Sequence, residues 1–176
     1  MAEATLHGAG GMGPVMTRAQ AARAIALLLP LALVAGAFAF QYLGGLYPCE
    51  MCWWQRYAHG AAVVLAALAF TAPAPAKRAR VLTLLAAAAI AISGAIGVYH
   101  AGVELHIFQG FTTCSTTAKG ASTAELLQNL MKVPLIRCDQ VQWSLFGISM
   151  AGWNAIVSLS GAALILWLML AGRCAR

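Results

Sequence analysis

Long uncharged stretches dominate the chain. Four of them contain no Asp, Glu, Lys or Arg: 24–49, 57–76, 81–103 and 140–172. Each is long enough for a transmembrane helix, which needs about 20 predominantly apolar residues. The chain has none of the repeated short period-two segments that a membrane β-barrel requires. We therefore predict an all-α membrane protein with four transmembrane helices, near residues 24–43, 53–71, 81–99 and 145–170.

The connections between these helices differ in length. Segment 44–52 is short, and the connection after the second helix is a polar turn with two prolines that end the helix. Segment 100–144 is the only sizeable loop. Within it, Ser122 and Glu125 have the spacing of a capping box, which predicts a short helix over 124–131. This helix is expected either to lie on the membrane surface or to pack on top of the bundle.

The composition supports a membrane protein. Of the 176 residues, 61% are hydrophobic and 9% are charged, whereas ordinary soluble domains have roughly a quarter of charged residues. This deficit excludes a soluble globular enzyme, a disordered protein and a nucleic-acid-binding module. The net charge of +6 comes from 11 Lys and Arg residues that are spread too thinly for polyanion binding.

The distribution of Lys and Arg predicts the orientation in the membrane. Seven of them lie at one end of the predicted helices: Arg18, Arg23, Lys77, Arg78, Arg80, Arg173 and Arg176. The other end holds the remaining four together with four of the five acidic residues. Because basic loops stay in the cytoplasm, we expect 1–22 and 173–176 to be cytoplasmic tails of a membrane domain formed by 23–172. Segments 44–52 and 100–144 then face outward.

A cleaved signal peptide is the alternative interpretation of the first helix. Ala37, Phe38 and Ala39 have the small-x-small pattern of a cleavage site. However, the apolar run continues as far as Cys49, and cleavage would leave an odd number of spans. We therefore expect the first helix to be retained.

The cysteines are the candidate reactive groups. Cys49 and Cys52 form a Cys-Glu-Met-Cys motif where the second helix is expected to begin. Cys114 and Cys138 lie in the long outer loop, and Cys174 lies in the cytoplasmic tail. Four of the five cysteines therefore face the oxidising side of the membrane, where disulfides persist. Structural disulfides, a zinc site and redox catalysis are all compatible with this placement.

Redox catalysis is favoured among these alternatives. A helix N-terminus stabilises a thiolate, and the two sulfurs of a Cys-x-x-Cys motif can close a small exchangeable ring. A zinc site is disfavoured because Cys114 and Cys138 do not form a second Cys-x-x-Cys. Arg56 lies one turn beyond Cys52 on the same helix face, where a charge inside the membrane is costly unless it has a function. Arg56 is expected either to serve a thiolate or a membrane quinone, or to snorkel to the membrane edge.

Several short motifs occur in a particular order along the chain. They are Pro-Cys-Glu-Met-Cys-Trp-Trp-Gln-Arg at 48–56, Tyr-His-Ala-Gly-Val-Glu at 99–104, Cys114-Ser115, Cys138-Asp139 and Trp-Ser-Leu-Phe-Gly-Ile-Ser-Met at 143–150. Together they resemble the bacterial disulfide-bond formation protein B (DsbB) family from about Arg23 to Leu170. The related vitamin K epoxide reductases place the loop cysteines before the membrane Cys-x-x-Cys, whereas here they come after it.

The resemblance implies a thiol oxidase of the bacterial inner membrane. It would reoxidise a periplasmic thioredoxin-like oxidase of the DsbA type and pass the electrons to the membrane quinone pool. Cys52 would face ubiquinone (or menaquinone) and form a complex with it, with Cys49 as its partner. Cys114 would form the mixed disulfide with the oxidase, and Cys138 would be able to exchange with Cys49. All four cysteines would lie on the periplasmic side.

The resemblance also implies which residues bind the quinone. Arg56 would bind or polarise it, and His100 matches the position of a family histidine near it. Gln55 departs from the acid that some members carry beside the arginine, which affects local tuning. Membrane lipid is an expected partner, and neither nucleic acid nor a metal ion is expected.

Two other classes of function stay open at this point. One is a structural membrane protein whose disulfides only brace the outer loops. The other is a haem- or metal-binding bundle that uses His59, His100 or His106. We expect His59 to be a packed or hydrogen-bonded residue, and we expect Gly94 and Gly97 to permit close packing of helices.

Overall fold

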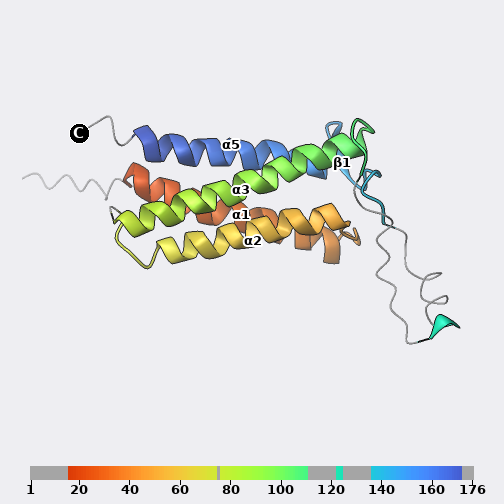
Figure 1. The fold of residues 1–176 in the computed structure, drawn as a ribbon, viewed down its shortest axis with the longest axis horizontal. Helices are drawn as coiled ribbons and strands as arrows, with labels where there is room; N and C mark the ends of the chain where they lie inside the picture. Colours follow the sequence, from red (N-terminus) through yellow and green to blue (C-terminus); the bar gives the residue numbers. More distant parts are fainter. Residues whose placement is uncertain (1–15, 75, 111–121, 125–135, 172–176) are drawn as a thin grey trace, which may run out of the picture.

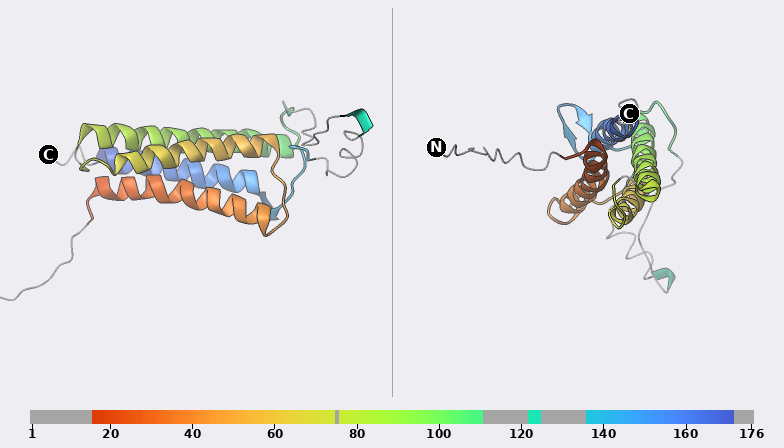
Figure 2. Two further views of the ribbon diagram at one scale, coloured as in Figure 1. Left: turned by 90° about the horizontal axis from the view of Figure 1, so that it is seen from below. Right: turned by 90° about the vertical axis from the view of Figure 1, so that its left-hand side faces the viewer.

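The computed structural model describes residues 16–74, 76–110, 122–124 and 136–171 (Figure 1). They form four long helices and one short hairpin: α1 (Arg18–Tyr42), α2 (Glu50–Ala69), α3 (Lys77–Glu104), β1 (Ser144–Leu145), β2 (Ile148–Ser149) and α5 (Met150–Ala171). Each long helix packs mainly against two others, in the cyclic order α1, α2, α3, α5, as the end view in Figure 2 shows, and α1 also touches α3. The predicted helical fold with four helices is confirmed.

The helices differ in how well they suit a membrane. α1, α3 and α5 are long and apolar enough to cross one, with mean hydropathies of 2.1, 2.3 and 1.9 over their most apolar segments. α2 does not meet the same criterion, and its sequence includes Gln55, Arg56 and His59. A span formed by α2 therefore stays a prediction.

Capping side chains explain why the first two helices begin earlier than predicted. α1 starts at Arg18 because Thr17 and Gln20 form a capping box, in which the Gln20 N–H donates to Thr17 Oγ1 at 3.3 Å and the Thr17 N–H to Gln20 Oε1 at 2.8 Å. α2 starts at Glu50 because the Cys49 sulfur accepts a hydrogen bond from the Cys52 N–H at 3.3 Å. The first cysteine of the motif thus caps the helix that carries the second.

A tight hairpin lies where the last helix was expected to begin, so the predicted start near 145 is wrong. Phe146 and Gly147 form its turn with φ values of 53° and 77°, the positive values that a two-residue type I′ turn requires. Leu145 pairs with Ile148 across the turn, and α5 begins only at Met150. At the other end of the long loop, α3 continues to Glu104. The short helix predicted over 124–131 lies outside the described residues, apart from its first position.

Small residues let the helices approach closely. The main hydrophobic core consists mostly of alanines from all four helices, with Ile90, Ile165 and Met169. A Cβ added to Gly94 would lie 2.8 Å from Leu159 Cγ, and one added to Gly97 would lie 3.0 Å from the Ala151 carbonyl oxygen. The predicted role of these two glycines in close packing is confirmed, here between α3 and α5.

Arginines cap the helix ends at the end of the bundle opposite the Cys-x-x-Cys motif. Arg23 donates to the Ala69 carbonyl at 2.7 Å, Arg18 to the Ala171 carbonyl at 3.3 Å, and Arg80 to the Met169 carbonyl at 3.4 Å. The last carbonyls of a helix lack partners within the helix and carry partial negative charge, so arginines suit them. The start of α1 and the end of α5 therefore lie together at this end of the bundle.

Candidate functional site

The start of α2 brings the two cysteines of the motif together. Because Cys49 is the N-cap and Cys52 lies in the first turn, their sulfur atoms are only 2.9 Å apart. Cys49 is buried, whereas Cys52 is partly exposed. A pair of sulfurs at a helix N-terminus, one of them accessible, is suited to reversible disulfide formation.

A third cysteine lies against this pair. Cys138 is buried in one cluster with Cys49, Met51 and Val103, and Cys52 packs against the same cluster. A hydrogen bond with the Cys138 thiol, a second with Cys52, and burial raise the pKa of Cys49 above its ordinary value. When the cysteines are reduced, Cys49 therefore keeps its proton to a higher pH than an ordinary thiol does. The structure brings together three of the four cysteines predicted to react.

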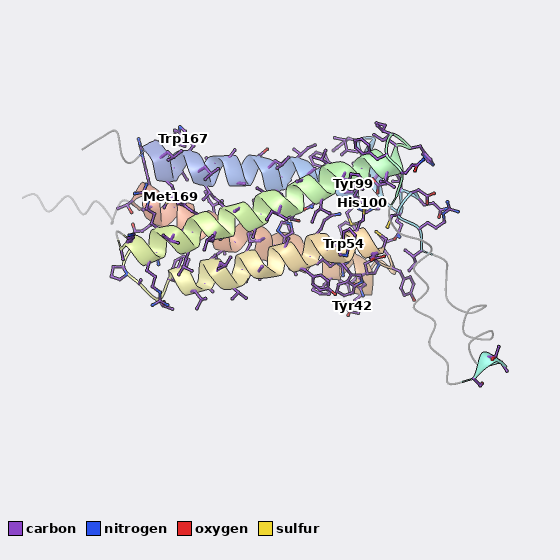
Figure 3. The ribbon with its side chains drawn as sticks, viewed as in Figure 1. Tyr42, Trp54, Tyr99, His100, Trp167 and Met169 are labelled. Carbon is purple, nitrogen blue, oxygen red and sulfur yellow. The ribbon has the colours of Figure 1, made fainter. Side chains whose placement is uncertain are left out.

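The predicted histidine lies beside the same sulfurs. His100 is buried near the end of α3, and its Nε2 lies 3.5 Å from the Cys49 sulfur. Its Nδ1 lies 3.0 Å from Gln55 Nε2, and Glu104 Oε1 lies 3.9 Å from its Nε2. Figure 3 shows His100 at the same end of the bundle as Trp54 of α2 and Tyr42 of α1, with Trp167 at the opposite end of α5.

Arg56 is directed toward α1. Its guanidinium donates to the Gln41 side chain and, at 3.1 Å, to the Ala37 carbonyl. The Phe38 and Trp53 rings lie 4.9 and 5.0 Å from its central carbon, within the range of cation–π attraction. Arg56 is therefore held in place between two helices, which the alternative of a snorkelling side chain did not predict.

A cavity of about 300 Å³ opens beside these groups. Apolar side chains of α1, among them Leu33, Val34 and Phe40, form part of its wall. The polar lining includes these residues: Cys49, Cys52, Gln55, Arg56, His59, His100 and Asn154. Such a cavity, mostly apolar with a few polar groups, is typical of sites for small organic ligands.

Polar residues of three helices form a buried network that the sequence did not reveal. Asn154 of α5 donates to Gln55 Oε1 at 2.8 Å and to the Ser93 carbonyl at 3.3 Å, and His59 Nε2 lies 2.9 Å from Asn154 Oδ1. The expectation that His59 is packed and hydrogen-bonded is confirmed. Single polar residues inside apolar stretches were the available signal, but their partners were not predictable.

Some predicted residues cannot be placed with the rest. Cys114 and Cys174 lie outside the described residues. His106 is exposed just beyond α3, with a φ of 58°. Among the described residues, the donor atoms of Cys49, Cys52 and His100 lie within 4.8 Å of one another, close enough to hold a metal ion.

The fold and the site define a class of protein, a multi-pass helical membrane protein with a Cys-x-x-Cys dithiol at the start of one helix. The chain belongs to the DsbB family, because the family model described as "Disulfide bond formation protein DsbB" matches residues 19–168. The resemblance inferred from the sequence motifs is thereby confirmed.

Curated relatives carry the corresponding name. The chain is 35% identical over 150 residues to the Disulfide bond formation protein B of Shewanella amazonensis, covering 82% of this chain and 85% of the relative. It is 33% identical over 135 residues to that of Burkholderia thailandensis, covering 73% and 76%. It is 28% identical over 140 residues to that of Marinobacter nauticus, covering 75% and 80%. No solved structure matches the chain.

Proposed function

We propose that this chain is a membrane thiol oxidase that reoxidises a periplasmic thioredoxin-like oxidase of the DsbA type and passes the electrons to a membrane quinone. Membership of the DsbB family supports its place in disulfide-bond formation. The observation that carries the finer proposal is the meeting of Cys49, Cys52 and Cys138 beside a cavity that Arg56 lines. This arrangement joins a thiol-exchange site to a site for an apolar oxidant.

The proposed topology has four spans, with α2 as the fourth. The capping arginines would then lie on the cytoplasmic side of the bacterial inner membrane, together with the tails 1–22 and 173–176. The Cys-x-x-Cys motif would lie at the periplasmic surface. Arg56 would lie one turn deeper, at the level of the cavity.

Thiol exchange would proceed through the cysteines in sequence. A thiolate of the reduced partner attacks Cys114 of a Cys114–Cys138 disulfide, and Cys138 leaves as a thiolate. Cys138 then attacks Cys49 of a Cys49–Cys52 disulfide, and Cys52 leaves as a thiolate. The burial of Cys138 against Cys49 supports this second step. Release of the oxidised partner frees the Cys114 thiolate, which attacks Cys138 and restores the Cys114–Cys138 disulfide. Cys49 leaves as a thiolate, so Cys49 and Cys52 are both reduced and ready to return two electrons to the oxidant.

The residues around the cavity fit a quinone. A quinone accepts two electrons and two protons when it is bound there. The apolar side chains of α1 suit its ring, and Arg56 offers N–H donors to a carbonyl oxygen. Cys52 also lines the cavity, so its thiolate would face the ring. Ubiquinone and menaquinone both meet this description.

Quinone reduction by the purified protein tests the proposal. The detergent-solubilised chain is supplied with ubiquinone and a reduced thioredoxin-like oxidase, and the quinone absorbance is followed. We expect partner-dependent turnover that Cys52→Ser abolishes and Arg56→Ala weakens, with Cys174→Ser as the matched control that leaves it unchanged. Absence of turnover in folded protein with several partners, or full turnover by Cys52→Ser, would overturn the proposal. Absence of turnover would instead favour a structural membrane protein whose disulfides only brace the outer loops.

A further inference from the structure

A continuous chain of side-chain contacts connects α5 to the reactive cysteines. Asn154 Nδ2 donates to Gln55 Oε1 at 2.8 Å. Gln55 Nε2 lies 3.0 Å from His100 Nδ1, and His100 Nε2 lies 3.5 Å from the Cys49 sulfur. Gln55 and His100 are buried and Asn154 is partly buried. Each group in this chain therefore constrains which atom of the next group donates and which accepts.

Two backbone carbonyls fix the orientation of both side-chain amides. Gln55 Nε2 lies 3.2 Å from the Met51 carbonyl oxygen, and Asn154 Nδ2 lies 3.3 Å from the Ser93 carbonyl oxygen. A carbonyl can only accept a hydrogen bond, so each of these contacts requires the NH₂ group and not the amide oxygen. The contact between Asn154 Nδ2 and Gln55 Oε1 requires the same two orientations. Rotating either amide would place oxygen against oxygen.

The fixed amides determine which nitrogen of His100 carries the proton. Because Gln55 presents its NH₂ group to His100 Nδ1, that nitrogen must accept the hydrogen bond. The proton of the neutral imidazole is then on Nε2. The Cys49 sulfur, 3.5 Å from Nε2, can accept from it, and the Glu104 carboxylate oxygen Oε1 lies nearby at 3.9 Å. Cys52 is the other titratable group nearby.

We propose that Asn154, acting through Gln55, is a positioning residue that holds His100 in the Nε2–H tautomer, so that His100 is a hydrogen-bond donor to the Cys49 sulfur and not a base for its thiol. The significance of this arrangement for turnover rests on the thiol-oxidase function proposed above. The tautomer itself does not depend on that function.

The donor acts at one defined step of the exchange. When the Cys114 thiolate attacks Cys138 in a Cys138–Cys49 disulfide, a Cys114–Cys138 bond forms and the Cys138–Cys49 bond breaks. The electron pair of the broken bond remains on the Cys49 sulfur, which leaves as a thiolate. The Nε2–H group then donates to this anion, and hydrogen bonds to charged groups are stronger than those between neutral groups. No proton needs to pass through the imidazole.

The fixed orientation of the Asn154 amide also predicts the tautomer of His59. Asn154 presents Oδ1 to His59 Nε2 at 2.9 Å, so that nitrogen must donate. The proton of His59 is therefore also on Nε2. Its Nδ1 is buried and has no hydrogen-bond partner among the described residues. This agrees with a nitrogen that carries no proton and therefore has no donor group to satisfy.

Nitrogen NMR of the reduced full-length protein tests the tautomers directly. Histidine is labelled with ¹⁵N, no quinone is added, and the His59 and His100 signals are assigned from His59→Gln and His100→Gln. We expect both imidazoles to carry the proton on Nε2 at neutral pH. A proton on Nδ1 of His100 in the unmodified chain would overturn the proposal.

Substitutions of Asn154 test its control over His100. In Asn154→Asp the new carboxylate cannot donate to Gln55, so the Gln55 amide rotates and presents Oε1 to His100 Nδ1. We expect the fraction of molecules in which His100 carries its proton on Nε2 to fall from nearly one to below one half. Asn154→Leu removes one of the two contacts that orient the Gln55 amide and leaves the weaker one to the Met51 carbonyl, so it should give a mixture. Ser160→Leu on the exposed face of α5 should leave the signal unchanged. An unchanged His100 signal in both Asn154 variants would contradict the proposal.

A double-mutant cycle separates positioning from a structural role. We expect Asn154→Leu to lower partner-dependent turnover about tenfold, the effect of one hydrogen bond to a charged group. In the His100→Gln background the same substitution should have no further effect, because it acts through His100. An equal loss in both backgrounds would show a structural role and refute the positioning. Failure of all turnover would count against the thiol-oxidase function, while the NMR result would still decide the tautomer.

Discussion

Arg56 of α2, which lines the cavity, donates a hydrogen bond to the side chain of Gln41 on α1. A second N–H group donates to the Ala37 carbonyl, so the guanidinium is fixed at two points. An arginine fixed in this way is preorganised for a ligand, because little side-chain freedom remains to be lost on binding. The oxidant site therefore depends on α1 as much as on the helix that carries the cysteines.

Release of Arg56 from α1 should weaken quinone binding. In Gln41→Leu the guanidinium keeps its charge and its contact with the Ala37 carbonyl but loses the other contact that orients it. We therefore expect the KM for quinone to rise about 3- to 10-fold with little change in kcat. Leu31→Ala, an exposed position on the same helix, is the matched control and should change neither constant. Steady-state assays over a range of quinone concentrations measure both. A fall in kcat at constant KM would contradict this role.

The proton held by Cys49 should make the two cysteines of the motif react at different pH. An ordinary cysteine has a pKa of about 8.5. A hydrogen bond with Cys138, and a smaller contribution from one with Cys52, raise the pKa of Cys49, so its thiolate forms only at a higher pH. Alkylation needs the thiolate. In the reduced protein, the midpoint for labelling of Cys49 should therefore lie above that of N-acetylcysteine.

Removal of Cys138 distinguishes this cause from simple burial. Cys138→Ala removes the hydrogen bond that contributes most to the raised pKa of Cys49. The pH midpoint for labelling of Cys49 should therefore fall toward that of an ordinary cysteine. Peptide mass spectrometry after short pulses of iodoacetamide at several pH values gives the midpoints independently of absolute rates. If the labelling midpoint of Cys49 in the unmodified chain lies at or below that of N-acetylcysteine, the pKa of Cys49 is not raised and the prediction is wrong.

Local signals in the sequence were sufficient for much of the fold and part of the site. Charge-free stretches predicted the four helices, and the three-residue spacing of Cys49 and Cys52 at a helix start predicted that their sulfurs meet. The hairpin was missed because Phe146 has a positive φ, which is uncommon for a bulky residue and has no sequence signal. The start of α5 was misplaced for this reason.

Contacts between distant residues could not be predicted from local patterns. Family resemblance implied that Cys138 reacts with Cys49, but no pattern in the sequence brings the two into one cluster. Asn154 is a single amide in an apolar stretch, and a buried amide needs partners. Which partners it has depends on how α5 is rotated against α2 and α3, and that rotation is set by packing at Gly94 and Gly97.

Close packing at Gly97 should make this position intolerant of even one methyl group. A Cβ there would lie 3.0 Å from the Ala151 carbonyl oxygen and 3.2 Å from Asn154 Nδ2. We expect Gly97→Ala to destabilise the protein by about 1–3 kcal/mol, because backbone must move. Gly60→Ala is the control, since a Cβ at Gly60 meets nothing within 4 Å, and it should be neutral or stabilising by up to about 1 kcal/mol. Unfolding in detergent compares the two, and equal stabilities would refute this packing.

The contact of Arg23 with α2 should stabilise the opposite end of the bundle. Arg23 is buried, donates to the Ala69 carbonyl at 2.7 Å, and has its guanidinium carbon 4.4 Å from the Phe70 ring. Arg23→Leu leaves that carbonyl without its donor, so we expect a loss of about 1–3 kcal/mol in unfolding free energy. Arg78→Leu removes an exposed charge from the same end of the bundle and should change stability by less than about 0.5 kcal/mol. If the two variants unfold alike, the arginine contributes only charge, and its hydrogen bond to the helix end adds nothing to stability.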